Sequence, residues 1–192
     1  MHRITLVFVG AVLPLAAQTF DAQIFLGRQT YNTFNRSGVE AKADAKTIAA
    51  LRFEAAFLPG AHHVTVGLAW QPKTKTKVDV SALGSYLGSG DLEHDSWGLS
   101  VGYRYEGAFE AGVAVDYRGD KLTDGTDSTN YGRPWLRGHV GWAPSHPGWR
   151  PVFGLELATP LATTNDDVQS SEAVLKSLAP SFQAGIYVGI RF

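Results

Sequence analysis

The residues of this chain that could do chemistry are charged side chains that alternate with apolar ones. Five arginines, five acidic residues and one histidine share this two-residue spacing: Arg52, Glu54, Arg104, Glu106, Glu110, Asp116, Arg118, Arg137, His139, Glu156 and Arg191. Matched charges on one narrow face should pair with one another, because an unpaired buried charge costs several kcal/mol. The set could form a gated path for ions or a polar core that fills the interior of the protein. We interpret it as a polar core.

The remaining reactive residue types give little support to catalysis or metal binding. Cysteine is absent, which excludes disulfides, cysteine-ligated zinc and a thiol nucleophile. His62 and His63 are adjacent, so in a strand they point to opposite faces and form no metal clamp. The polar run of His94, Asp95 and Ser96 is interpreted as part of a solvated loop. We therefore expect no catalytic residue, no cofactor and no metal.

The charged positions lie on segments with the two-residue period of β-strands. The clearest segment is 181–192, where every second residue from Phe182 to Phe192 is apolar and the residues between are polar or small. The segment 47–58 is rich in alanine and would also suit a helix. The pattern predicts eight strands: 20–28, 47–58, 62–71, 97–106, 109–118, 134–143, 149–158 and 181–192.

The connections between these strands alternate in length. The short turns are 59–61, 107–108 and 144–148, and the long loops are 29–46, 72–96, 119–133 and 159–180. Short turns at one end and long loops at the other are typical of outer-membrane β-barrels. A strand of about 10 residues, tilted by about 40°, also spans the apolar band of about 25 Å that such barrels present to lipid.

The N-terminal residues have the anatomy of a secretory signal peptide. Arg3 supplies a positive charge, residues 4–15 are almost wholly apolar, and Ala16 and Ala17 are small. We expect a signal peptide over 1–17 and one barrel domain over 18–192. No segment reaches the about 18 consecutive apolar residues of a comfortable spanning helix. A net charge of −1 gives no reason to expect nucleic acid as a partner.

The residue types indicate which face of each strand points inward. The charged face also carries most strand glycines: Gly27, Gly67, Gly98, Gly102, Gly112, Gly141, Gly154, Gly185 and Gly189. The interior of an eight-stranded barrel is just wide enough for side chains, so glycines there make room for large neighbours such as Phe25, Trp135 and Tyr187. The opposite face carries aromatic residues near strand ends, as membrane-interface girdles do: Trp70, Trp97, Tyr103, Tyr105, Phe109, Tyr117, Trp142 and Phe192.

The end of the chain carries apolar residues at two-residue steps: Ile186, Val188, Ile190 and Phe192. With these residues, and with its alternation of short turns and long loops, the chain resembles the small outer-membrane β-barrels of the OmpA membrane-domain and OmpX type. The resemblance covers 18–192. It implies an all-β, eight-stranded, antiparallel up-and-down transmembrane barrel in the cell outer membrane of a Gram-negative-type bacterium. These four residues resemble the signal read by the barrel-assembly machinery, although Ile190 stands where an aromatic is common.

The resemblance also implies an integral, non-enzymatic protein for envelope stability or surface interaction. Its partners would be outer-membrane lipids, the barrel-assembly machinery and an extracellular ligand held by the loops. The alternatives are a lipid-modifying enzyme, for which His139-Val140-Gly141 departs from the expected His-x-Ser pair, and a minor small-solute pore. The polar inward face disfavours a soluble barrel for an apolar ligand. Lys73, Lys75 and Lys77 alternate with threonines, so the third strand would rise above the bilayer, where these lysines meet lipid phosphates or only solvent.

Overall fold

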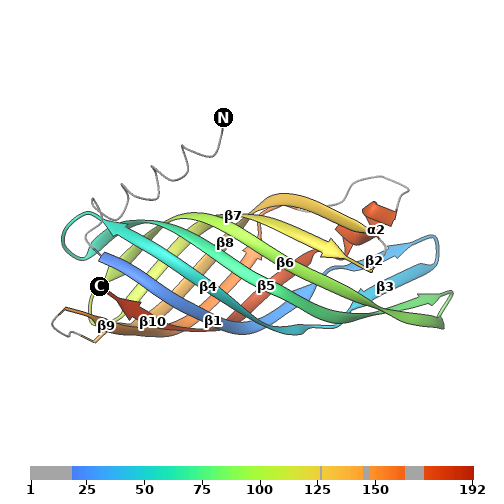
Figure 1. Ribbon diagram of the computed structural model, residues 1–192, viewed down its shortest axis with the longest axis horizontal. Helices are drawn as coiled ribbons and strands as arrows, with labels where there is room; N and C mark the ends of the chain where they lie inside the picture. Colours follow the sequence, from blue (N-terminus) through green and yellow to red (C-terminus); the bar gives the residue numbers. More distant parts are fainter. Residues whose placement is uncertain (1–18, 126, 145–147, 163–170) are drawn as a thin grey trace.

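Eight antiparallel strands close into a barrel in the computed structural model, which describes residues 19–125, 127–144, 148–162 and 171–192 (Figure 1). The expected signal peptide lies outside the described residues. The ring consists of β1 (Thr19–Tyr31), β4 (Lys46–Phe57), β5 (His62–Ala82), β6 (Ser85–Glu106), β7 (Glu110–Thr123), β8 (Ser128–Trp142), β9 (Arg150–Pro160) and β10 (Pro180–Arg191). Each predicted strand overlaps one of these, and the predicted all-β fold is confirmed.

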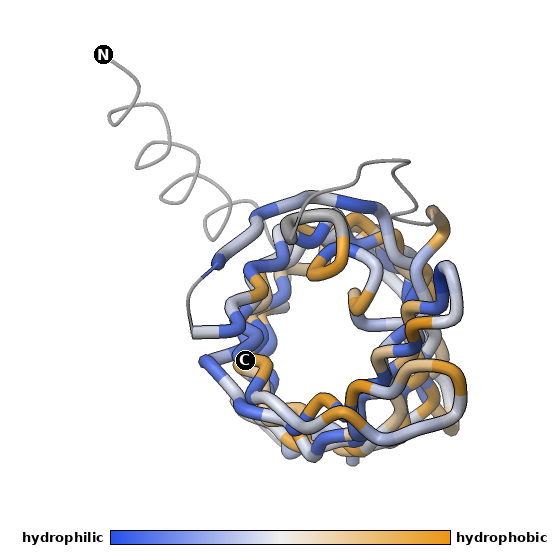
Figure 2. Tube along the Cα trace, turned by 90° about the vertical axis from the view of Figure 1, so that its right-hand side faces the viewer, coloured by the Kyte–Doolittle hydropathy of each residue, from blue (hydrophilic) through white to orange (hydrophobic). Residues whose placement is uncertain are grey.

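The ring closes where the first strand meets the last. β1 pairs with β10, and the backbone of Phe20 exchanges hydrogen bonds of 3.1 and 2.9 Å with that of Phe192. Figure 2 looks along the barrel and shows the trace closing on itself. Closure is needed at membrane depth because lipid offers no hydrogen-bond partner to an unpaired strand. We call the end that carries Phe192 and the short connections the turn end.

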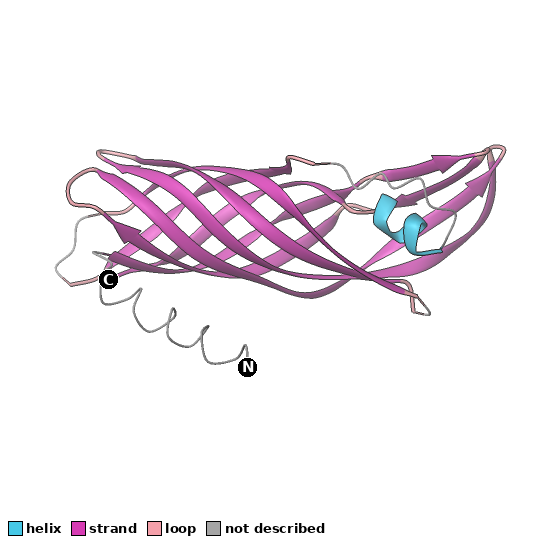
Figure 3. Cartoon of the chain, turned by 90° about the horizontal axis from the view of Figure 1, so that it is seen from above, coloured by secondary structure: helices cyan, strands magenta, loops and turns pink. Residues whose placement is uncertain are grey.

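At the opposite end the sheet continues far beyond the ring (Figure 3). β5 and β6 contain 21 and 22 residues. At about 3.3 Å per residue each is about 70 Å long, whereas the apolar band of a barrel is about 25 Å tall. A hairpin joins this extension by pairing with β5. We call the extension the blade, and it consists of β2 (Thr33–Arg36), β3 (Val39–Ala43), 72–82 of β5 and 85–96 of β6.

The blade corrects the prediction that 29–46 and 72–96 are long loops, because both segments are mainly strand. Each turns through two residues of positive φ: 53° and 78° at Ser37 and Gly38, and 51° and 80° at Leu83 and Gly84. These are the angles of a type I′ hairpin turn, whose twist matches the flanking strands.

The segment 119–133 is likewise strand outside 124–127, because β7 ends at Thr123 and β8 begins at Ser128. The rise of the third predicted strand above the barrel is confirmed.

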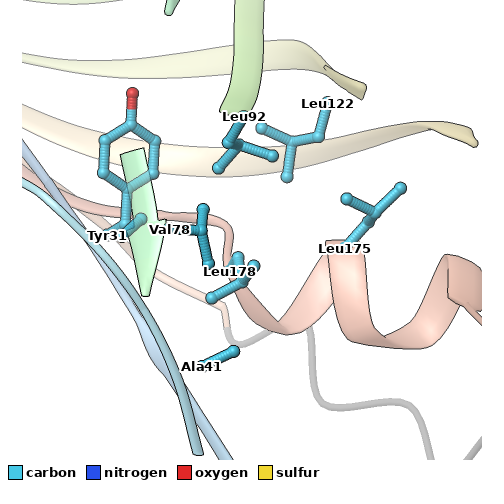
Figure 4. Close-up of a cluster of buried hydrophobic side chains, with 8 residues drawn as sticks. Tyr31, Ala41, Val78, Leu92, Leu122, Leu175 and Leu178 are labelled. Atoms are coloured by element: carbon cyan, nitrogen blue, oxygen red, sulfur yellow. The ribbon is translucent and has the colours of Figure 1, made fainter. Parts of the chain in front are cut away.

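The last long connection contains a helix, α2 (Ser171–Ser177), where the sequence predicts a polar loop. Leu175 and Leu178 are buried in an apolar cluster with side chains of β1, β3, β5, β6 and β7. Figure 4 shows these side chains pointing toward one another. We call this set the roof cluster: Tyr31, Ala41, Ala43, Val78, Leu92, Leu122, Leu175 and Leu178. Within the described ranges, no helix is long and apolar enough to cross a membrane.

Apolar side chains cover the outside of the barrel and charged ones fill the inside. Leu68 is 57% exposed and Val101 is 61% exposed, whereas Arg104 is only 1% exposed. The alanine-rich segment 47–58 follows the same rule, with Phe53 exposed and Arg52 buried. This is the reverse of a soluble barrel, and the predicted assignment of faces is confirmed.

Inward glycines make room for large side chains. An added Cβ at Gly112 would overlap the imidazole ring of His139, and one at Gly141 or Gly154 would overlap the hydroxyl of Tyr187. The lumen around His139 and Tyr187 therefore has no room for further side-chain atoms, as expected for a ring of eight strands.

Candidate functional site

Paired charges fill the lumen from the turn end upward. In the lowest layer, Asp21 accepts hydrogen bonds from Arg104 Nη1 at 2.7 Å and from Arg191 Nε at 2.6 Å. Arg191 also lies 2.7 Å from Glu110 and 2.9 Å from Glu106. Each of these arginines thus has several carboxylates, which offsets its removal from water.

A second layer of charges lies above the first. Arg137 donates to Asp116 Oδ1 at 3.1 Å and to Glu54 Oε2 at 3.4 Å. It also lies 3.7 Å from Glu156, which forms an ion pair with Arg52. The carboxylates of this layer are shared between arginines, so removing one member disturbs several pairs.

The predicted lumen residues all have their side chains on the inner side of the barrel wall. Ion pairs connect the five arginines and the five carboxylates among them. His139 Nε2 lies 3.7 Å from Glu110 Oε1, and the phenol of Tyr187 donates to the same oxygen at 3.2 Å. A role for this network beyond filling stays a prediction.

Sequence reasoning missed three charged residues of the lumen. Asp21 lies four residues before Phe25, so the alternation of the first strand places both side chains on the inward face. Asp120 and Arg133 are also buried. The sequence predicts a loop over 119–133, so the alternation of inward positions is not followed into this segment.

The prediction that His94 lies in a solvated loop is wrong. His94 is 1% exposed, and its Nε2 lies 2.9 Å from Asp120 Oδ1. Its Nδ1 lies 2.9 Å from the amide nitrogen of Gln29 and 3.1 Å from that of Gln71. Since both amides donate to Nδ1, this pattern assigns the ring proton to Nε2, which donates to Asp120. The neighbouring Ser96 is buried as well.

Glutamine amides form a third layer, between the charges and the roof cluster. Gln183 Oε1 accepts from Arg118 Nη1 at 2.5 Å, and Gln183 Nε2 donates to Gln29 Oε1 at 2.5 Å and to Gln71 Oε1 at 3.3 Å. Along its length the lumen thus changes from layers of ion pairs, through a layer in which amides lie beside Asp120 and Arg133, to the apolar roof cluster. Over the part of the chain that the structure describes, no group of three His, Cys, Asp or Glu side chains could hold a metal ion.

Two rows of exposed aromatic side chains bound the apolar outer surface. Trp70 and Trp97 are directly paired across β5 and β6 in the row nearer the blade. Side chains of this kind mark the two interfaces of a bilayer, and we take the strand segments between the rows as membrane-spanning. The rows are Trp70, Trp97 and Tyr117 toward the blade, and Tyr105, Phe109, Trp142 and Phe192 at the turn end. The predicted assembly residues Ile186, Val188, Ile190 and Phe192 are all exposed on this surface.

Two of the blade lysines are paired within the blade. Lys73 Nζ lies 2.8 Å from Glu93 Oε2, and Lys75 Nζ lies 3.0 Å from Glu93 Oε1. These hydrogen bonds raise the pKa of both lysines and lower the pKa of Glu93. Contact of the lysines with lipid phosphates stays a proposal.

A closed barrel with an apolar belt and a filled polar lumen defines the class of the protein: it is a small integral outer-membrane β-barrel protein. Among solved structures, the chain is similar to the outer membrane protein OprG from Pseudomonas aeruginosa. The two chains are 16% identical, the match covers 92% of this chain and 97% of that one, and the TM-score is 0.59.

Two further solved structures are similar. Neisserial surface protein A is 11% identical over 90% of this chain and 95% of that one, with a TM-score of 0.49. Ail of Yersinia pestis, in complex with the heparin analogue sucrose octasulfate, is 11% identical over 91% and 98%, with a TM-score of 0.44. No protein-family model matches the chain, and no curated protein matches it.

At these identities the likeness to OprG concerns the fold, and at that level the expected resemblance to small outer-membrane barrels is confirmed. The fold is that of a transmembrane β-barrel whose apolar belt would face membrane lipids.

Proposed function

We propose that the protein is a closed, non-enzymatic barrel that acts through its blade, in envelope stability or in contacts at the cell surface. The filling of the lumen carries this proposal. Two layers of paired charges, a layer of amides and the roof cluster follow one another along the barrel. A solute that crossed would have to separate buried ion pairs and leave charges uncompensated, which is strongly unfavourable.

Single-channel recording tests the closed lumen. Barrels whose closure is verified by heat-modifiable gel migration should give no steady conductance in a planar bilayer. Heat-unfolded protein from the same preparation serves as the control for background leakage. A large steady conductance from closed barrels would favour the small-solute pore instead.

The surroundings of His94 support the absence of catalysis. A lipid-modifying enzyme needs a base or nucleophile that can reach lipid at the outer rim. The two ring nitrogens of His94 are engaged by Gln29, Gln71 and Asp120, and the ring is buried. Mass spectra of lipid A from cells with and without the protein should therefore be identical, and an added or missing acyl chain would overturn this part of the proposal.

We propose that the barrel-assembly machinery reads the apolar face of β10. Phe192 is exposed at the seam where β1 and β10 meet, so it is accessible before closure. Phe192→Ala should reduce the amount of heat-modifiable protein in cells while the purified variant still refolds in detergent. Phe109→Ala, at an exposed aromatic of the same interface, is the matched control and should assemble normally.

The tip of the blade supports a surface contact. Leu83 is 90% exposed, Tyr86 is 67% exposed and Leu87 is 64% exposed, and they lie well beyond the lipid. Clustered apolar side chains in water mark interaction sites. Replacing all three with serine should lower the attachment of cells to a hydrophobic surface at equal barrel abundance, whereas Asn35→Ser on β2 should not. Unchanged attachment would remove the blade tip from the proposal.

The blade lysines carry the proposed contact with lipid phosphates. Changing Lys73, Lys75 and Lys77 to glutamine should weaken retention of the purified protein on vesicles that contain anionic lipid. Unchanged retention would mean that these lysines do not contact lipid phosphates.

A further inference from the structure

Among the residues that the structure describes, several buried hydrogen-bond donors on β8 have no acceptor. Arg133 is 3% exposed, and its Nη2 donates to the carbonyl oxygen of Pro180. Its Nε and Nη1 have no hydrogen-bond partner among the described residues. The indole Nε1 of Trp135, which is 0% exposed, and the hydroxyl of Tyr131 also lack one there.

These donors lie close together at alternate positions of one strand. The guanidinium carbon of Arg133 lies 5.0 Å from the ring centroid of Trp135 and 5.6 Å from that of Tyr131. Burial raises the pKa of the Tyr131 hydroxyl, so it remains a donor at neutral pH. The three side chains face the lumen between the second charged layer and the roof cluster.

The electrostatics of the group favour a negative occupant. Arg118 is directly opposite Arg133 in the ladder of β7 and β8, and its guanidinium carbon lies 4.2 Å from the same indole ring. Like charges at directly paired positions are unfavourable. Arg118 has Asp116 as a partner at 3.2 Å.

The nearest carboxylate compensates Arg133 only in part. Asp120 Oδ2 lies 3.8 Å from Arg133 Nε, which is too long for a hydrogen bond. The other oxygen of Asp120 is held by His94 at 2.9 Å. Arg133 Nη1 is therefore a buried, charged N–H donor with no acceptor among the described residues.

We propose that a small monovalent anion, a halide or a short carboxylate, resides at Arg133 Nη1 beside the indole N–H of Trp135. An arginine N–H and an indole N–H can only donate. An anion can accept from both donors at once. Arg133 and Trp135 are 3% and 0% exposed, so the anion would be captured as the barrel closes.

Bromide provides the test, because it scatters anomalously. The full chain is refolded from denaturant into detergent in sodium bromide and crystallised, and data are collected at the bromine edge. An anomalous peak is expected within hydrogen-bond reach of Arg133 Nη1, and it should be absent from Arg133→Gln. Density at this place without an anomalous signal, or a peak that persists in the variant, would overturn the proposal.

A measurement in solution accompanies the crystals. The urea midpoint of the wild type should rise relative to that of Arg133→Gln as bromide replaces sulfate, and formate in place of bromide separates a carboxylate from a halide. Trp135→Phe keeps an aromatic ring, though a smaller one, and loses the N–H, so it should show a smaller rise. It also serves if Arg133→Gln does not fold. Arg28→Gln, at an exposed arginine outside the lumen, should behave as the wild type. Equal bromide shifts in all four proteins would refute a specific site.

Discussion

Asp21 is the carboxylate on which the arginines of the lowest layer converge. It is fully buried and accepts from both Arg104 and Arg191. Breaking a buried pair costs about 3–5 kcal/mol because the remaining charge is uncompensated. Asp21→Ala should cost about 3 kcal/mol of unfolding free energy, the low end of that range, because Glu106 still lies beside both arginines.

Urea unfolding in lipid vesicles checks this value. Asp79→Ala, at an exposed residue of the blade, is the matched control and should be nearly neutral. A loss of the same size in both variants would mean that Asp21 is not a centre of the lumen charges.

Glu93 gives a pH prediction at the surface. Its hydrogen bonds to Lys73 and Lys75 hold its pKa below the ordinary value of 4.5. Because the folded pKa is lowered, these pairs contribute fully above the ordinary pKa and are lost as the pH falls through the lowered folded value. In the double variant Lys73→Gln, Lys75→Gln, an NMR titration of the Glu93 carboxyl should show its pKa return toward 4.5.

The groups around Glu93 are exposed, so this titration should hardly change the unfolding free energy. Glu40→Gln, elsewhere on the blade, is the control and should leave the pKa of Glu93 unchanged. A Glu93 pKa that does not respond to the lysine substitutions would mean that the pairs do not form in solution.

At the scale of single strands, the membrane-spanning faces make a quantitative prediction. Val113 on β7 and Val188 on β10 point outward within the apolar belt. An arginine near the bilayer midplane of a barrel costs about 2–4 kcal/mol. Val113→Arg and Val188→Arg should each lower the unfolding free energy in lipid vesicles by about this amount.

Val39→Arg is the control for these substitutions, because Val39 is also exposed but lies on the blade. It should have little effect, since an arginine there remains in water. Neutral results at both membrane positions would show that the belt does not face lipid.

The same strands show how far a sequence can predict such a barrel. Within the belt, the contrast between apolar and charged residues marks every strand, because one face meets lipid and the other meets the lumen. Beyond Trp70 and Trp97 the contrast fades, since a blade strand such as 73–77 meets water on its outer face and needs no apolar residue there. Strand ends, the blade and the inward position of His94 were therefore missed.

Other features of the lumen cannot be predicted from the sequence, because they depend on how the strands are aligned in three dimensions. Alternation identified Arg137 and Glu54 as inward, but it could not say that they meet, because they lie on strands far apart in the ring. Leu175 of the short helix α2 and Leu178, just beyond its end, are three residues apart, and this spacing becomes meaningful only when the roof cluster is known. The donor group at Arg133 likewise depends on which atoms lack partners.

For the whole molecule, two structures could close the lumen: the charged layers within the membrane and the roof cluster beyond it. Val78 and Leu92 connect the roof cluster to the blade. Thr76 and Leu92 are directly paired across β5 and β6. A two-residue Asn-Gly turn can therefore replace 77–91 without changing the register, because such turns join directly paired residues. This deletion removes the blade tip and Val78 while retaining His94 and every charged layer.

The shortened protein should still close, because the seam of β1 with β10 and the charges of Asp21, Arg104 and Arg137 are untouched. Its heat-modifiable migration should match that of the full chain, while the amides of α2 should exchange faster with solvent because Leu178 has lost Val78. In planar bilayers the shortened protein should show no steady conductance, because buried ion pairs resist separation whether or not the roof cluster covers them. A steady conductance from closed, shortened barrels would instead assign closure to the roof cluster and make the blade part of a gate.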